Sequence, residues 1–308
     1  AFADIKSTGL FGGARRLNLS LKHSALEPYA VQLQWIQPQF PGKKSSIAIN
    51  PFIIRKSEPG YKTRTYGINI PFNYQVNPWL NTQATWYFED VEQRVEAGDE
   101  EFTDFNDEKF PYQKSGFLMS GFFDNSSPRF SPERGIHFSA GMKLNGYLFE
   151  SIFNYSRLWS DFRTYQKTGK VIWAYRVMAG FIHSSDSSGF IPVEDRYYSG
   201  GSNSIRGWSR AQLGPKRQSG TPLGGKSIFE SNLELRYPVF GQFSLVAFFE
   251  AGNVWKESFS WQFNQLGYAA GSGLRFETPI GPVRFDTGFP LWNEQKSPQF
   301  FISVGHAF

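Results

Sequence analysis

The residues best suited to chemistry in this chain lie in one Gly- and Ser-rich stretch. It runs Gly200, Gly201, Ser202, Asn203, Ser204, Ile205, Arg206, Gly207 and Trp208. Glycine, serine and asparagine favour a tight turn, while the aliphatic and aromatic neighbours of Arg206 indicate a loop tip that is packed. A packed guanidinium needs a partner, and its planar N–H groups match a carboxylate. The alternative is a mobile Gly-rich hairpin loop.

Two other groups of residues could do chemistry, but their spacing argues against both. Of the four histidines, only His137 has a serine two residues on, Ser139, and no acidic residue stands at a fixed spacing to orient a hydrolase. A calcium site is the second possibility, because several carboxylates lie close together: Asp99, Glu100, Glu101, Asp104 and Asp107. Their order does not match an EF-hand loop. We therefore expect no enzyme, no bound metal and no cofactor.

The composition indicates strands that cross a membrane. Aromatic residues make up 18% of the 308 residues, yet the mean hydropathy is −0.41. The chain has no apolar run of about eighteen residues, so helical membrane spans are excluded. A transmembrane β-barrel combines these properties, because alternate residues face lipid and a polar lumen. The net charge of +5 is dispersed without a basic stripe, so we expect no nucleic-acid partner.

Alternation of apolar and polar residues predicts where the strands lie. In residues 229–237 the polar set is Glu230, Asn232, Glu234 and Arg236, and in residues 243–251 it includes Glu250. These polar residues are expected to face inward. Further alternating segments span residues 17–22, 29–35, 66–74, 80–89, 115–123, 136–144, 147–159, 171–181, 283–289 and 300–308.

Two segments need separate comment. Residues 47–54 are apolar on both faces and fit the alternation least well. Residues 268–276 are predicted to form a strand. Gly271 and Gly273 within it, and Gly267 just before it, are expected on the inward face. Since glycine has no side chain, these positions leave room for another segment to pack.

Three interruptions separate the strands. Glu89 to Lys109 is charged and is expected to form a surface loop without a bound metal. Asp124 to Gly135 contains two prolines and a glycine, which make a turn that neither strand can continue. The third and longest interruption, residues 183–225, contains the stretch around Arg206.

The motifs together resemble the BamA/TamA outer-membrane assembly superfamily. Gly200 to Trp208 is similar to the loop-six signature of that family, with Ile205 and Trp208 as departures from its usual residues. The turn Asp124 to Gly135 echoes a second family motif, although Ser126 replaces an arginine. A penultimate-strand motif is matched by Gly281, Pro282, Arg284 and Asp286, and the chain ends on Phe308, as outer-membrane barrels often end on an aromatic.

The resemblance implies a fold and a site. The fold is an all-β, antiparallel transmembrane barrel of the sixteen-strand type, with about fifteen strands in residues 1–308. The loop at 183–225 folds into the lumen, where Arg206 contacts Glu234 and Glu250. The first strand and the N-terminal periplasmic (POTRA) domains are expected to precede this chain. Phe300 to Phe308 then forms one side of a seam between the first and last strands.

The resemblance also implies a function without covalent chemistry. It places the chain in the bacterial outer membrane as a protein insertion or translocation factor that works through the seam and the lumenal loop. The implied partners are outer-membrane lipids, unfolded outer-membrane proteins and periplasmic or lipoprotein accessory subunits. A two-partner secretion transporter of the same superfamily is the alternative, and a passive porin is an alternative from another class.

Overall fold

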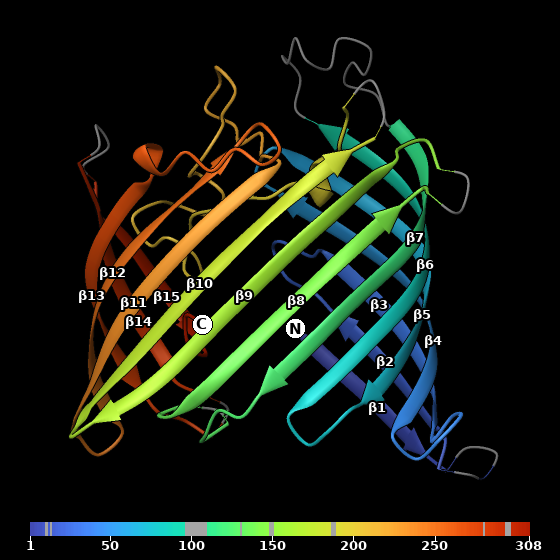
Figure 1. Cartoon of the computed structure of the whole chain (residues 1–308), viewed down its shortest axis with the longest axis horizontal. Helices are drawn as coiled ribbons and strands as arrows, with labels where there is room; N and C mark the ends of the chain where they lie inside the picture. The colour runs from blue at the N-terminus through green and yellow to red at the C-terminus, as the bar shows by residue number, and fades with distance from the viewer. Residues whose placement is uncertain are drawn as a thin grey trace. The chain divides into compact units, whose positions relative to one another are not determined.

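In the described part of the chain, fifteen strands form one sheet in which sequence neighbours lie side by side, and the pairings from β1 to β6 and from β10 to β15 are antiparallel (Figure 1). The computed structural model describes residues 1–9, 12, 14–95, 110–129, 131–147, 151–185, 189–279, 281–292 and 297–308. Within these residues, no helix has the length and apolar content needed to cross a membrane. The prediction of an all-β antiparallel fold with about fifteen strands is confirmed.

The first eight strands are β1 (Phe2–Thr8), β2 (Arg16–Lys22), β3 (Tyr29–Pro38), β4 (Ser45–Glu58), β5 (Tyr61–Gln75), β6 (Leu80–Val95), β7 (Phe110–Asp124) and β8 (Gly135–Asn145). The remaining seven are β9 (Tyr155–Thr168), β10 (Val171–Ser184), β11 (Ser227–Phe240), β12 (Phe243–Trp255), β13 (Gly267–Phe276), β14 (Val283–Leu291) and β15 (Gln299–Val304). The described residues also include two short 3-10 helices, η2 (Val193–Asp195) and η3 (Phe263–Gln265).

The chain divides into two compact units. Unit 1 comprises Ala1–Gly121, Gly141–Arg157 and His183–Asp195, and unit 2 comprises Phe122–Ala140, Leu158–Ile182 and Arg196–Phe308. The long segment between β10 and β11 therefore contributes its beginning, with η2, to unit 1. Its remainder, with the stretch around Arg206, belongs to unit 2.

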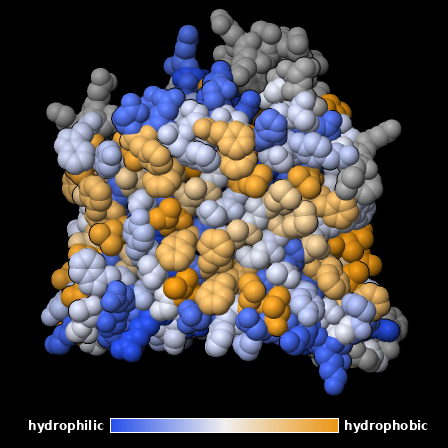
Figure 2. Space-filling view, viewed as in Figure 1, coloured by the Kyte–Doolittle hydropathy of each residue, from blue (hydrophilic) through white to orange (hydrophobic). Residues whose placement is uncertain are grey.

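The strands have one apolar exposed face and one buried face. On β12, Leu245 and Phe249 are 50% and 43% exposed, whereas the intervening Phe248 and the adjacent Glu250 are 5% and 0% exposed. In Figure 2 apolar side chains gather over the middle of the strands that face the viewer, and hydrophilic side chains gather toward the strand ends. This is the arrangement expected of strands whose outer face meets lipid.

Two boundaries differ from those predicted. Glu89 was expected to open a loop, but β6 continues to Val95, and Glu89 pairs with Gly67 of β5. The alternation between the exposed face and the buried face continues in this part of β6, but the residues on the exposed face are charged. The charged composition therefore led to the prediction of a loop instead of a strand. Residues 96–109, with the carboxylates weighed as a calcium site, lie outside the described residues. Likewise β9 begins at Tyr155, where a strand from Tyr147 was predicted.

The segment that fitted the alternation least well is nevertheless a continuous strand. β4 runs through Asn50 and Pro51, and these residues pair with Asn69 and Ile68 of β5. The predicted turn between Asp124 and Gly135 lies where β7 ends and β8 begins. Within it, Ser127 and Arg134 form an isolated bridge.

The end of the chain departs from the predicted alternation. The alternating segment predicted over residues 300–308 would place Phe300 and Phe308 on the same face of one strand. Phe300 is 74% exposed, whereas Phe308 is only 7% exposed. The regular strand ends at Val304, and Gly305 has a φ of 92°, a left-handed conformation that changes the chain direction. Phe308 consequently packs with Tyr165 and neighbouring alanines in unit 2.

A buried arginine cluster as the candidate functional site

Three strands of unit 2 place acidic side chains on the buried face of the sheet. Glu234 lies on β11, Glu250 on β12 and Asp286 on β14, and all three are at most 2% exposed. The residue opposite Glu234 is Phe248, and the residue opposite Asp286 is Gly273. Buried carboxylates are costly unless they are paired, so this face requires cations.

Arg206 supplies the central cation from the loop. Its Nη1 donates to Glu234 Oε2 at 2.9 Å and to Asp286 Oδ2 at 3.2 Å, and its Nε donates to Glu250 Oε1 at 2.8 Å. Its backbone N–H also donates to Glu250 Oε2 at 2.6 Å. The guanidinium carbon lies 3.5 Å from the centre of the Phe248 ring, so the cation also contacts an aromatic face. The predicted partners Glu234 and Glu250 are thus both within hydrogen-bonding distance of Arg206.

Three strand arginines complete the cluster. Arg236 Nε donates to Glu234 Oε1 at 2.7 Å, and Arg275 donates to Glu234 at 3.2 Å and to Asp286 at 2.6 Å. Arg284 Nη1 lies 3.6 Å from Asp286 Oδ2. Every member of the cluster is at most 3% exposed. Such a buried network fixes geometry, because each charge depends on the position of the others.

The Gly- and Ser-rich part of the loop forms the turn that brings Arg206 to this position. Gly200 and Gly201 have φ values of 99° and 109°, which side chains rarely allow. The Gly201 N–H donates to the Trp208 carbonyl at 2.9 Å, and the Gly200 N–H donates to Ser204 Oγ at 2.8 Å. The Ser204 hydroxyl in turn donates to Glu230 of β11. The turn is therefore joined both to itself and to the sheet.

The other polar residues of the motif have different positions. Asn203 accepts a hydrogen bond from Arg284, so the loop motif and the penultimate-strand motif meet at these two residues. Ser202 is half-buried. Gly281 and Pro282 lie just before β14, where the Gly305 N–H donates to the Pro282 carbonyl at 2.8 Å. Phe300 has its side chain on the exposed face of β15.

Apolar packing also holds the loop tip. Ile205 and Trp208 are 0% and 2% exposed and form a cluster with Leu213 and Ala269. A Cβ at Gly267 would lie 2.8 Å from the Trp208 ring, and one at Gly288 would lie 2.1 Å from the Arg206 carbonyl oxygen. The inward glycines therefore leave the space that the loop occupies.

Unit 1 contains a second buried charge cluster, which sequence reasoning missed. Lys114 Nζ lies 3.0 Å from Glu89, 2.8 Å from Glu194 and 2.9 Å from Asp195. Asp195 also contacts Lys143 Nζ at 2.8 Å and accepts a hydrogen bond from the Tyr155 hydroxyl at 2.5 Å. The available signal was the inward position of the two lysines in the alternation, but Asp195 lies 81 residues from Lys114 and 52 residues from Lys143 in the chain.

The second cluster fixes η2 at the beginning of the loop. Burial alone would raise the pKa of the Asp195 carboxyl, but Lys114 and Lys143 outweigh burial and hold that pKa well below its usual range. Asp195 is therefore ionised at neutral pH. Among the described residues, no group of three or more His, Asp or Glu residues is placed to hold a metal ion.

Comparison with known proteins identifies the family. The Omp85 superfamily domain matches residues 10–308. The outer membrane protein assembly factor BamA of Nitratidesulfovibrio vulgaris is 35% identical over 133 residues, which are 40% of this chain and 17% of that protein. BamA of Neisseria meningitidis serogroup B is 27% identical over 156 residues, covering 38% of this chain and 19% of that protein. These matches cover less than a fifth of each relative.

Solved structures share the fold. BamA from Haemophilus ducreyi lacking POTRA domains 1–3 has a TM-score of 0.87 at 19% identity and covers 99% of this chain and 66% of that chain. CdiB from Acinetobacter baumannii has a TM-score of 0.62 at 13% identity, covering 97% of this chain and 54% of that one. Since the domain match extends over almost the whole sequence, this chain belongs to the Omp85 superfamily of bacterial outer-membrane β-barrel proteins.

Proposed function

We propose that this chain is the membrane part of an outer-membrane protein assembly factor and that it promotes insertion of other barrel proteins without covalent chemistry. The observation that carries the proposal is the burial of Arg206 of the loop against Glu234, Glu250 and Asp286. A loop that merely joined two strands of a pore would need no such anchor. The similarity to BamA sequences supports the same function.

In this proposal the loop acts as a positioning element. Arginine stays protonated and its carboxylate partners are fully buried, so the cluster has no group free for acid–base or nucleophilic work. A paired network instead holds one loop conformation against one region of the sheet. We expect the loop to keep β11 to β14 in the geometry that a substrate strand meets.

β15 is the element that we propose contacts the substrate. It is last in the strand order and pairs with β14 over six residues. Phe300, Ile302 and Val304 are 74%, 74% and 59% exposed on one face. A strand at the end of a sheet can accept an incoming strand by backbone hydrogen bonding, which is β-augmentation. Unfolded outer-membrane proteins supply such strands.

The test is a reconstitution assay. The full-length protein in lipid vesicles should accelerate folding of an added outer-membrane barrel protein, measured by the mobility shift of the folded barrel on gels. Arg206→Ala should reduce that acceleration about tenfold or more, because a positioned loop is lost. Arg210→Ala is the matched control, since Arg210 is an exposed arginine on the same loop.

Two results would contradict the proposal. Equal activity of Arg206→Ala and the wild type would mean that the anchored loop has no part in assembly. Export of a soluble protein with no effect on barrel insertion would favour a secretion transporter, the alternative that the CdiB likeness keeps open. Large, steady single-channel currents would favour a porin.

A further inference from the structure

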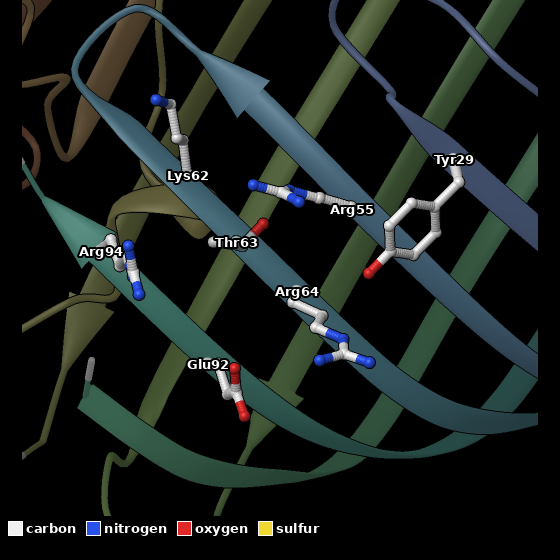
Figure 3. Close-up of a pocket in the computed structure, with 7 residues that line it drawn as sticks. All are labelled: Tyr29, Arg55, Lys62, Thr63, Arg64, Glu92 and Arg94. Atoms are coloured by element: carbon white, nitrogen blue, oxygen red, sulfur yellow. The ribbon is translucent and has the colours of Figure 1, made fainter.

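A group of basic side chains lies on unit 1, far in sequence from the loop motif. A pocket of about 250 Å³ lies on β3 to β6. Figure 3 shows its lining residues, Tyr29, Arg55, Lys62, Thr63, Arg64, Glu92 and Arg94. Four of the seven are cations and one is a carboxylate. Neither the loop nor the buried clusters involve any of these residues.

Strand register places like charges directly opposite each other in this pocket. Arg55 of β4 pairs with Arg64 of β5, and Lys62 of β5 pairs with Arg94 of β6. On its other side Arg64 lies opposite Glu92 of β6, the one carboxylate among the lining residues. Like charges at directly opposed positions destabilise a sheet. In the described part of the chain, no ion pair to a carboxylate is recorded for these four cations. These two cross-strand pairs, Arg55 with Arg64 and Lys62 with Arg94, are called the basic rows below. An anion bound between them would remove the repulsion between the cations.

The basic rows belong to the exposed face of the sheet. The next pair along β4 and β5 on the same face is Ile53 with Tyr66, and Tyr66 is 39% exposed. The opposite face carries Thr63 and Gln93, which are 3% and 4% exposed and pair with each other. The cations therefore point away from the buried face, toward the surroundings of the protein.

The basic rows also begin where the apolar part of that face ends. Along β5 from Tyr66, away from Arg64, the same face continues with Ile68 opposite Phe88 and Ile70 opposite Trp86. The Arg64 guanidinium lies 4.8 Å from the centre of the Tyr66 ring, which joins the charged and aromatic zones. Apolar residues followed by an aromatic and then by charges mark the position of a lipid headgroup on a membrane strand.

We infer that this pocket binds the phosphate groups of a membrane lipid headgroup. Arginine recognises phosphate oxygens through paired N–H donors, and lysine adds a compact charge. Two cation rows suit a headgroup with two phosphates better than one with a single phosphate. Counted with Glu92 and Asp90 on the same face, the four cations leave a net charge of about +2, which favours a headgroup of net negative charge over one whose phosphate is balanced by an amine.

The experiment measures lipid retention by the folded protein in a mild detergent. Native mass spectrometry would count bound lipid during titration with a bisphosphorylated glucosamine lipid, its dephosphorylated form and phosphatidylethanolamine. We expect the bisphosphorylated lipid to bind about tenfold or more tightly than the other two. Arg55→Gln with Arg64→Gln should abolish that preference.

The matched control removes two charges at the other end of the same strand. Lys43 and Lys44 are exposed residues immediately before β4, and their double change to Gln should leave lipid binding unaltered. If the Arg55 and Arg64 double variant does not fold, Arg55→Lys with Arg64→Lys keeps the charge and should retain the preference with weaker binding. The gel mobility shift reports folding for each variant.

Three results would overturn the inference: equal binding of the phosphorylated and dephosphorylated lipids, an unaltered preference in the folded Gln variant, or saturation by inorganic phosphate as tight as that by the lipid. The last result would describe a site for a free anion. The inference is independent of the proposed function, because insertion activity can be measured in phosphatidylcholine vesicles that contain none of these phosphorylated lipids.

Discussion

Arg206 binds Glu250 twice, through its backbone N–H at 2.6 Å and its side-chain Nε at 2.8 Å. The two donors use both oxygens of one carboxylate. The contact therefore fixes the main chain of the loop as well as the guanidinium, which a side-chain ion pair alone would not do. Loss of either partner leaves a buried charge without its principal counterion.

We expect Glu250→Ala to lower the free energy of unfolding of the folded barrel by about 3–5 kcal/mol, because it leaves a buried guanidinium partly unpaired. Urea unfolding in detergent micelles, followed by tryptophan fluorescence, measures the loss. Arg210→Ala should change the same free energy by less than about 0.5 kcal/mol, since it is an exposed substitution. A Glu250→Ala protein as stable as the wild type would contradict a structural role for the contact.

Gly288→Ala should displace the loop without altering any charge. Its Cβ would lie 2.1 Å from the Arg206 carbonyl oxygen, a backbone atom that cannot rotate away. We expect a destabilisation of about 1–3 kcal/mol and faster proteolysis of the segment that contains Arg206. Gly121→Ala is the control, because a Cβ there meets nothing within 4 Å. Equal proteolysis rates for the two variants would show that the loop does not depend on this close approach.

His306 should make the stability of the protein fall in mild acid. Burial, aided by the charge of Arg236, lowers the pKa of the His306 imidazole to about 3. Since the unfolded chain takes up this proton near pH 6.5, unfolding becomes progressively easier as the pH falls from about 6.5 toward 3.

The Nε2 atom of the His306 ring lies 3.2 Å from Ser131 Oγ. The variant that tests this prediction is His306→Gln, which keeps a polar group near Ser131 but has no titrating ring. Unfolding midpoints measured between pH 7 and pH 4 should decline less steeply in this variant. Parallel curves for the two proteins would mean that His306 is accessible to protons in the folded state.

The alternation of residue types was enough to predict the strand faces, because each face has a single environment. Glu234 and Glu250 could be assigned to the buried face from their neighbours alone, and the resemblance then paired them with Arg206. Lys114 and Asp195 could not be paired in that way, since about eighty residues separate them and only the folded loop brings them together.

The end of the chain shows a different limit. The alternation predicts that Phe308 lies on the same face as Phe300. A single glycine in the left-handed conformation, Gly305, changes the chain direction between them. Glycine adopts positive and negative φ with similar ease, so its position in a sequence does not reveal which one is used. Such a local conformation depends on the packing partners, here Tyr165 and the alanines beside it.

The final prediction concerns Asp195, which anchors the beginning of the loop in unit 1. Because Lys114 and Lys143 hold the pKa of its carboxyl well below the usual range, the ionised group contributes stability above the unfolded pKa of about 3.9. That contribution is lost only as the pH falls through the lower folded value. Asp195→Asn should therefore destabilise the protein by a similar amount at every pH from about 5 to 8, and less in stronger acid.

Unfolding in urea at pH 7.5, 5 and 3 would measure this difference. The expected loss near neutral pH is about 3 kcal/mol, since the variant leaves the buried Lys114 and the half-buried Lys143 short of a counterion. Asp90→Asn is the control, because Asp90 is a half-buried carboxylate of the same unit. A difference between Asp195→Asn and the wild type that grows as the pH falls would contradict the prediction, because it would place the Asp195 pKa above its unfolded value.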